Sequence, residues 1–284
     1  MLSRRLWAVG ALFLALTMSA GAAPKKSDKT PPSKPSKEDV NDLSMEVAAL
    51  QTIHQLKLDK AQLEALGKLA REITPHAQER EAAKVSDKYR KALLAVRDAL
   101  TANDDARIEG RSTALDELRT KESPEVEEGV ELTAAARIKA GEVLALLKSQ
   151  QIASYLGAQE DDDLAGPADR LSAAFEESRK KSGEEWDEAR DAAAEAVGWL
   201  VAGLDADASA KMADQAKTLL ESGHLLSEAD FKAQRKELDT AAGKLAGDLS
   251  SMEVLRRVVE HGLAELLSNP RLGAAVEARL KTMK

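Results

Sequence analysis

The sequence predicts an all-α protein built as antiparallel bundles of amphipathic helices. Apolar residues recur every three or four positions through most of the chain, which is the spacing of one helix face. Aromatic residues make up only 3% of the 284 residues, so Leu, Ala and Val must form most of the core. Runs of alternating apolar and polar residues between hairpin turns, the pattern of strands, do not occur. We therefore expect helical subdomains and almost no β-structure.

The first 22 residues have the pattern of a signal peptide. Arg4 and Arg5 form a positive region, residues 6–18 are almost wholly apolar, and Ala-Gly-Ala at 20–22 fits the site of signal peptidase. We expect cleavage after this site and a secreted protein, most simply a periplasmic one if the source is bacterial. The alternative is an uncleaved anchor, because the apolar run approaches the ~18 residues that could span a bilayer. After cleavage we expect no membrane insertion.

The composition argues against several classes of function. The chain has no cysteine, which removes disulfides, thiolate nucleophiles and cysteine metal sites. Its formal net charge is −8, and loss of the two arginines of the signal peptide makes it about −10. Nucleic acids are bound by cationic grooves and aromatic platforms, and anionic lipids attract basic segments. We therefore expect neither nucleic acid nor an anionic lipid surface as a partner.

Composition shifts divide the remaining chain into four parts. Residues 23–37 are rich in Pro, Ser and Lys and predict a disordered linker. Residues 38–157 form the expected N-terminal helical domain, and residues 168–284 the C-terminal one. Between them, residues 158–167 hold four consecutive acids and a Gly-Pro pair, which indicates an acidic linker. The helix patterns of the two halves do not align at a fixed period, which speaks against a repeat protein.

Helix starts are predicted from residues that cap the first turn. A side-chain acceptor followed three positions later by an acid or Gln forms a capping box, and proline favours the first helical position. The chain offers capping boxes at Ser36/Asp39, Asp59/Gln62, Ser182/Glu185, Ser227/Asp230 and Ser250/Glu253, and proline starts at Thr74-Pro75, Ser123-Pro124 and Asn269-Pro270.

Two of the predicted helices carry long apolar stripes. The helix opened by Thr74-Pro75 is expected to run to about residue 102, with Val85 among its core residues. For the helix opened by Ser123-Pro124, the predicted core stripe is Val130, Ala134, Ile138, Gly141 and Leu144.

Two short stretches resemble the paired L-T-x-x-Q motifs of the Spy/CpxP family of periplasmic proteins. The first is LDKAQ, with Leu58, Asp59 and Gln62, and the second is LKSQQ, with Leu147 and Gln151. The resemblance covers roughly residues 45–157. It implies a four-helix, cradle-shaped dimer that acts as an ATP-independent chaperone or stress sensor, and some relatives bind metal.

The motif has a physical reading as a helix start. A Thr side chain accepts a hydrogen bond from the backbone of the first turn, and Gln three positions later reaches back to the cap. Asp59 can accept in place of Thr. Lys148, which stands at the Thr position of the second motif, has no acceptor and cannot cap the backbone as Thr does, so the second motif departs from the family pattern.

We expect no catalytic, cofactor-binding or metal site. The four histidines are His54, His76, His224 and His261, and none is three or four positions from another, as a helical zinc site would need. The chain has no G-x-S-x-G elbow and no Gly-rich phosphate loop. The acidic run at 160–163 lacks the alternating ligands of a calcium loop. The sequence therefore predicts a protein that is not an enzyme.

One aromatic residue is singled out as a possible interface anchor. Trp186 falls on the apolar stripe of its helix and is expected in the core, whereas Trp199 lies off that stripe. We expect a secreted helical binding protein, chaperone-like toward unfolded clients. The alternative is a structural or scaffolding protein of the cell envelope that docks a protein partner. The identity of partner or client and the oligomeric state stay open.

Overall fold

The computed structural model describes residues 39–73, 85–122, 130–159 and 164–283. Within these ranges the chain forms twelve α-helices and no strand, which confirms the all-α prediction. The predicted signal peptide, the linker 23–37, and the helix starts at Thr74-Pro75 and Ser123-Pro124 lie outside the described residues. The start predicted at Ser36/Asp39 is wrong: the first helix begins at Val40, because Asp39 is its N-cap and accepts from the Asn41 amide at 3.2 Å. None of the described helices is both long and apolar enough to cross a membrane.

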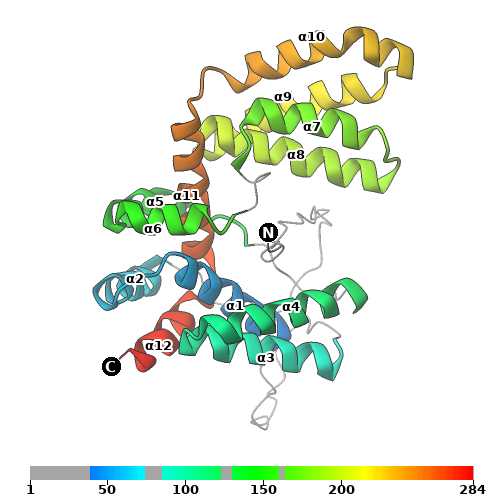
Figure 1. The fold of residues 1–284 in the computed structure, drawn as a ribbon. Coiled ribbons are helices and arrows are strands. Elements are labelled where there is room, and N and C mark those ends of the chain that lie inside the picture. Colours follow the sequence, from blue (N-terminus) through cyan, green and yellow to red (C-terminus); the bar gives the residue numbers. More distant parts are fainter. Residues whose placement is uncertain (1–38, 74–84, 123–129, 160–163, 284) are drawn as a thin grey trace, which may run out of the picture.

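The helices form two lobes that are joined by one long helix (Figure 1). The lower lobe contains α1 to α6 and α12, the upper lobe contains α7 to α10, and α11 runs from one lobe into the other. In chain order the helices are α1 (Val40–Gln55), α2 (Lys60–Ile73), α3 (Asp87–Ala102), α4 (Asp105–Glu122), α5 (Ala134–Leu146), α6 (Ser149–Leu156), α7 (Pro167–Ser178), α8 (Glu184–Ala202), α9 (Ala206–His224), α10 (Glu228–Ala246), α11 (Ser251–Ser268) and α12 (Leu272–Thr282).

Each lobe has its own hydrophobic core. The lower core joins α1 to α6 with the second half of α11 and with α12, and the upper core joins α7 to α10. A third, small cluster of Leu200, Val254 and Val258 connects α8 to the first half of α11. The largest buried side chains are Tyr89 and Tyr155 in the lower core and Phe175, Trp186 and Phe231 in the upper core.

The packing departs from the predicted C-terminal domain of residues 168–284. Residues 259–283 complete the lower core, because α11 spans about 27 Å and reaches past the upper lobe. Polar contacts fix them there: the Asn269 side chain donates to the Met45 carbonyl at 2.9 Å, and the Ser268 hydroxyl accepts from the Thr133 amide at 3.0 Å. The predicted domain is thus divided, with α7 to α10 as the upper lobe.

Several predicted helix starts have the expected caps. Ser227 accepts from the Asp230 amide at 3.2 Å, and Ser250 and Glu253 form a reciprocal capping box. The capping box predicted at Ser182/Glu185 is wrong: α8 begins at Glu184 after Gly183, whose φ of +58° suits glycine. The acids of its first turn are placed favourably against the helix dipole instead.

Two predicted stripes also need correction. Val85 lies before α3, which begins at Asp87 because the Ser86 hydroxyl accepts from the Tyr89 amide at 3.1 Å. In α5 the buried face is not the predicted one. The helix begins after the N-cap Thr133, and its buried residues are Ala136, Ala140 and Val143. The predicted core residues of this helix include Ile138, which is 74% exposed.

Helices α8 and α9 make the closest helix contact of the upper lobe. At Gly198, a Cβ atom would lie 2.6 Å from the Ser209 carbonyl oxygen and 3.1 Å from the Cβ of Ala213. Such distances mean that the two backbones meet with no room for a side chain. Any larger residue at position 198 must push the helices apart.

Candidate functional site

The two motifs predicted from the sequence lie side by side, at the starts of α2 and α6. In the first motif, Asp59 accepts from the Gln62 amide and Gln62 accepts from the Asp59 amide, both at 3.0 Å. In the second motif, the Gln151 side chain accepts from the Lys148 amide at 2.9 Å. Lys148 makes no side-chain cap, as expected, and its ammonium group instead donates to Asp59 at 3.1 Å. The ion pair thus links the two helix starts.

The two motif glutamines bind each other across 89 residues of chain. The Gln62 amide nitrogen donates to the Gln151 side-chain oxygen at 2.9 Å, and the reverse bond is 2.8 Å long. Each amide also donates to a backbone carbonyl next to the other motif, Gln62 to Leu146 at 2.7 Å and Gln151 to Lys57 at 3.0 Å. The bonds made by the first motif thus match those made by the second, so the two motifs are related by an approximate two-fold axis. We call Asp59, Gln62, Lys148 and Gln151 the motif clasp.

The geometry of the motif clasp indicates a structural role. Gln151 is only 8% exposed, and its side chain makes four hydrogen bonds, so its donors and acceptors are all used. Leu58 is buried in the lower core, and Leu147 packs against that core. All five predicted motif residues therefore meet in one place, where they join α2 to α6.

The clasp predicts a dependence of stability on acidic pH. The pKa of Asp59 lies below its ordinary value of 3.8, first because the Gln62 amide donates to the carboxylate and next because Lys148 does. A carboxylate with a lowered pKa stabilises the fold above its ordinary pKa, and this contribution is lost as pH falls through the lowered value. Urea unfolding at pH values between 5 and 2 should show this loss in the wild type and not in Asp59→Asn. Parallel pH profiles of the two proteins would contradict the prediction.

The predicted interface residue Trp199 lies at the joint between the lobes. Its ring stacks on His261 of α11 with 4.2 Å between ring centroids, and it packs against the small cluster that joins α8 and α11. The half-buried ring is therefore used within the chain, and its role as an interface anchor stays a prediction. Trp186 is 8% exposed, as expected for a core residue, and stacks on His224.

The described histidines make contacts within the fold. His54 Nδ1 lies 3.1 Å from the side-chain oxygen of Asn103, and His261 Nε2 lies 3.4 Å from the Glu265 carboxylate. His76 lies outside the described residues. Within the ranges that the structure describes, no three His, Asp or Glu residues are grouped so that they could hold a metal ion.

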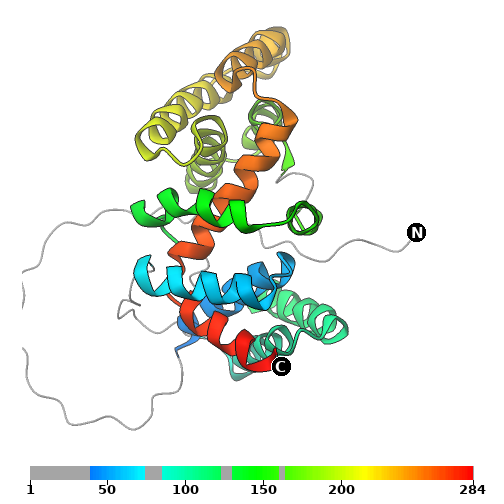
Figure 2. The ribbon, with the colours of Figure 1, turned by 90° about the vertical axis from the view of Figure 1, so that its left-hand side faces the viewer.

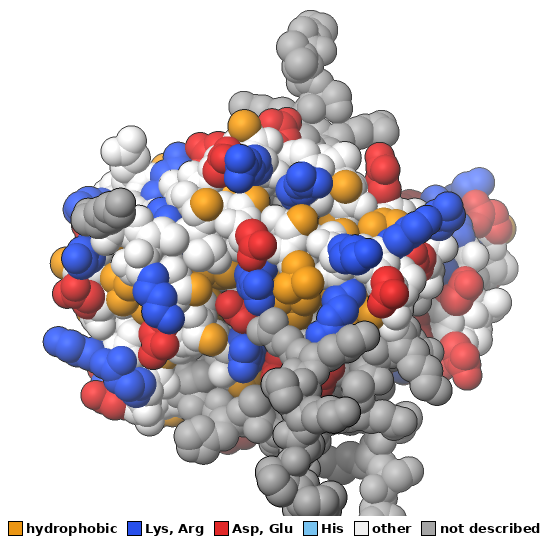
Figure 3. Space-filling view, turned by 90° about the horizontal axis from the view of Figure 1, so that it is seen from below, with side chains coloured by type: hydrophobic (Ala, Val, Ile, Leu, Met, Phe, Trp, Pro, Cys, Tyr) orange, Lys and Arg blue, Asp and Glu red, His pale blue; other side chains and the backbone are white. Residues whose placement is uncertain are grey.

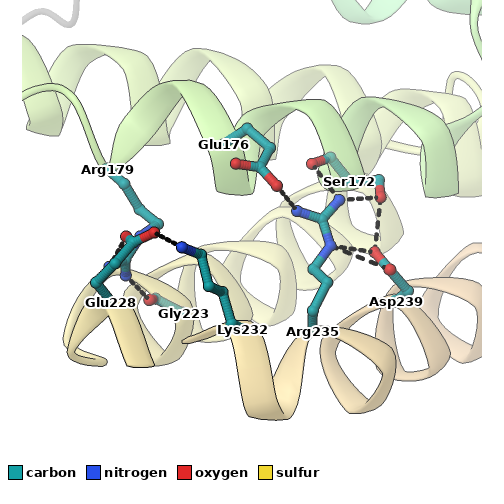
Figure 4. Close-up of polar contacts among 8 residues, drawn as sticks. All are labelled: Ser172, Glu176, Arg179, Gly223, Glu228, Lys232, Arg235 and Asp239. Atoms are coloured by element: carbon teal, nitrogen blue, oxygen red, sulfur yellow. Dashed lines mark hydrogen bonds and ion pairs between the residues drawn. The ribbon is translucent and has the colours of Figure 1, made fainter. Parts of the chain in front are cut away.

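A group of paired charges joins α7 to α10 in the upper lobe (Figure 4). Arg235 donates to Glu176, to Asp239 at 3.1 Å and to the Ser172 hydroxyl at 2.8 Å. The hydrogen bond from Ser172 and then the bonds from Arg235 hold the pKa of Asp239 below its ordinary value. Arg179 donates to the carbonyls of Gly223 and Leu226, both at 3.0 Å. Because these charges are paired, the group is an interhelical clamp.

A shallow groove lies between α2 and α12 in the lower lobe. Its volume is about 280 Å³, and charged residues of both signs surround an apolar floor. On the face seen from below, acidic and basic side chains are likewise interspersed with small apolar areas (Figure 3). Its lining residues are Glu64, Gly67, Lys68, Arg71, Gly273, Val276, Glu277 and Leu280.

The outer side of α5 is the most unusual surface of the lower lobe. Helix α5 lies across α11, and in Figure 2 no other helix lies in front of it. The exposed stripe consists of Ala134, Ile138, Gly141 and Ala145, at spacings of four, three and four residues. Leu146, at the end of the helix, is 47% exposed. We call these five residues the α5 face.

The apolar spacing of this face is visible in the sequence, where it predicts a buried stripe. Three of its residues belong to the stripe predicted to be buried: Ala134, Ile138 and Gly141. Helix α5 is apolar on two sides, and a helix of that kind is normally covered on both. Among the described residues, the buried side is the one with the small residues Ala136 and Ala140, because alanines allow close packing against the neighbouring helix.

The fold and these contacts define a two-lobed, all-α protein with a motif clasp and, within the described residues, an exposed apolar face on α5. Comparison of the chain with protein-family models, with curated proteins and with solved structures gave no match.

Proposed function

We propose that this is a secreted, periplasmic binding protein that holds unfolded protein clients without using ATP. The α5 face is the observation that carries the proposal. An apolar stripe with an isoleucine that is 74% exposed offers a place where an apolar segment of another chain is stabilised by burial.

The surroundings of the face suit weak and unspecific binding. Lys139 and Glu142 form an ion pair of 2.6 Å beside the stripe, so charges of both signs border it. Such a border keeps the protein soluble, while the short apolar stripe limits the affinity for any one client. The L-x-x-x-Q motifs, which resemble those of the Spy/CpxP family, support the same proposal, and so does the signal-peptide pattern.

The proposal is tested by replacing Ile138 with glutamine. We expect the wild-type protein to suppress aggregation of a heat-unfolded model protein in light-scattering assays without ATP. Ile138→Gln should bind the client about tenfold more weakly, because burial of an isoleucine side chain contributes ~1.5 kcal/mol or more. Its own stability should change by less than about 0.5 kcal/mol, since the side chain is mostly exposed.

The chain offers a matched control for this test. Met252, at the start of α11, is also 74% exposed and lies away from the α5 face. Met252→Gln should suppress aggregation as well as the wild type does. If the wild type leaves aggregation unchanged, the client-binding proposal fails. One stoichiometric partner recovered by crosslinking in envelope extracts, with no client binding, would favour the scaffolding function instead.

A further inference from the structure

Helix α10 is attached to the upper lobe by few apolar side chains. It lies along the outer edge of the lobe (Figure 1), and its buried residues are Phe231, Leu238, Ala242 and Ala246. The helix is packed mainly against α7 and α9. A helix of 19 residues with so few buried side chains depends on further contacts to keep its place.

Polar side chains supply these contacts, and they reach α7. Arg235 of α10 donates to the Glu176 carboxylate, and also to the backbone carbonyl of Ser172 at 3.1 Å. The Ser172 hydroxyl donates to the Asp239 carboxylate at 2.6 Å, so Asp239 is bound from α7 as well as by Arg235 of its own helix (Figure 4). The middle of α10 is thus tied to α7 through two carboxylates.

The first turn of α10 is tied in the same way. The Arg179 guanidinium, at the end of α7, lies 3.4 Å from the Glu228 carboxylate and 4.3 Å from the centre of the Phe231 ring. Lys232 also pairs with Glu228, at 3.1 Å. The described ties between α7 and α10 therefore involve three carboxylates: Glu176, Glu228 and Asp239.

Acid changes the charge balance of both helices. At neutral pH, α10 carries four acidic and four basic residues, and α7 carries three acidic residues and one basic residue. Once the carboxylates are protonated, both helices are positive, and the arginines of the interhelical clamp have lost their charged partners. His224, at the end of α9, becomes charged as well. Like charges then oppose a contact that few apolar side chains support.

The contact between α8 and α9 depends less on carboxylates. Arg190 of α8 pairs with Glu221 of α9 at 3.1 Å, and the other described ion pairs of this group involve Asp187, Asp191 and Lys217. The backbones of α8 and α9 also meet closely at Gly198, and that contact carries no charge. The α9 group that takes part in the clamp is the Gly223 carbonyl, which accepts from Arg179. Acid should therefore separate α10 from α7 before it separates α8 from α9.

We propose that α10 is an acid-sensitive helix, which leaves α7 when the carboxylates of the interhelical clamp are protonated and thereby exposes Phe175 and Phe231. In the closed form these two side chains are 1% and 4% exposed, and they belong to one core cluster. The release concerns the upper lobe. It does not depend on the proposed client binding, whose site lies on α5.

Two of the carboxylates indicate the pH at which the release begins. The pKa of Asp239 lies below its ordinary 3.8, first because the Ser172 hydroxyl donates to it and next because Arg235 does. The pKa of Glu228 lies below its ordinary 4.5, first because of Lys232 and next because of Arg179. Both carboxylates thus stabilise the closed form above their ordinary pKa, and this effect is lost as pH falls through the lowered values. We expect the release below about pH 4.

The test uses the absence of cysteine from the chain. Full-length protein with Ala242→Cys carries one thiol on the buried side of α10, where the alanine is 1% exposed. Full-length protein with Ala136→Cys carries one thiol in the lower core, where the alanine is fully buried. A dipyridyl disulfide, which reacts with thiols in acid, labels each protein at neutral pH and in acid below the expected release. Each labelling rate is divided by that of free cysteine at the same pH.

We expect the corrected labelling rate of Ala242→Cys to rise at least about tenfold in acid, while that of Ala136→Cys rises by less than about threefold, because only α10 opens. An unchanged rate for Ala242→Cys would overturn the proposal. Equal rises in the two proteins would overturn it as well, because the whole protein then unfolds.

A second set of variants tests whether the clamp carboxylates cause the release. In the Ala242→Cys protein, Asp239→Asn with Glu228→Gln keeps the side-chain sizes and removes both charges. Labelling at neutral pH should then be at least about fivefold faster than in Ala242→Cys alone, with a weaker dependence on pH. Glu237→Gln, at an exposed position of α10 outside the clamp, should leave the pH profile as it is. A clamp variant with an unchanged profile, or a Glu237→Gln variant with a flattened one, would show that these carboxylates do not control α10.

Discussion

Replacing Gln151 with leucine is expected to lower the free energy of unfolding by about 2–3 kcal/mol. Gln151 is nearly buried, and its side chain serves four partners at once. Leucine has a similar size but offers no donor or acceptor. The amide of Lys148, the carbonyl of Lys57 and the amide group of Gln62 would then lose their partners, and water can reach only some of them. Urea unfolding monitored by circular dichroism measures the loss.

The control is the neighbouring Gln150, which is exposed on the same helix. Gln150→Leu should change stability by less than about 0.5 kcal/mol. The clasp further predicts that Gln62→Leu and Gln151→Leu are not additive, because the second replacement removes a group that has already lost its partner. A double variant that loses the full sum of the two single effects would show that the glutamines act independently.

Gly198→Ala is expected to destabilise the upper lobe by about 1–3 kcal/mol, although alanine is the better helix former. The new methyl group would lie 2.6 Å from a backbone oxygen of α9, and a backbone cannot turn aside as a long side chain can. The helices must separate, which loosens the contacts that Val197 and Ala216 make in the upper core. Thermal unfolding should show a lower melting temperature.

Gly243 provides the opposite case within the same lobe. It lies inside α10, and a Cβ atom there would have no neighbour within 4 Å. Gly243→Ala should therefore raise stability by up to about 1 kcal/mol, because alanine restricts the unfolded chain and favours the helix. If both variants were stabilised, the close contact between α8 and α9 would not be as tight as the structure indicates.

Helix starts could be predicted from the sequence where the capping residues are close neighbours along the chain. The caps at Asp59, Ser227 and Ser250 depend on residues within three positions, and each is present. The start of α8 was predicted wrongly, because Gly183 takes a conformation that competes with the Ser182 cap. Which of two neighbouring residues becomes the N-cap depends on the backbone conformation of the segment before the helix.

Contacts between distant parts of the chain could not be predicted. Both motifs were found in the sequence, but nothing in a single sequence says that Gln62 and Gln151 bind each other. The α5 face shows the same limit in another way. Periodicity indicates which residues share one side of a helix, and it does not tell which of two apolar sides the rest of the chain covers. The placement of α11 and α12 in the lower lobe also depends on such distant packing.

The path of α11 has a consequence for how the protein is made. The carbonyl of Met45 receives its hydrogen bond from Asn269, 224 residues later, and that of Thr101 receives one from Thr282. A nascent chain therefore leaves open the parts of the lower core that α11 and α12 cover until these two helices have been synthesised. Contacts of this range slow folding. Assembly of the lower lobe thus waits for α11 and α12, which follow the other helices of that core only after the four helices of the upper lobe.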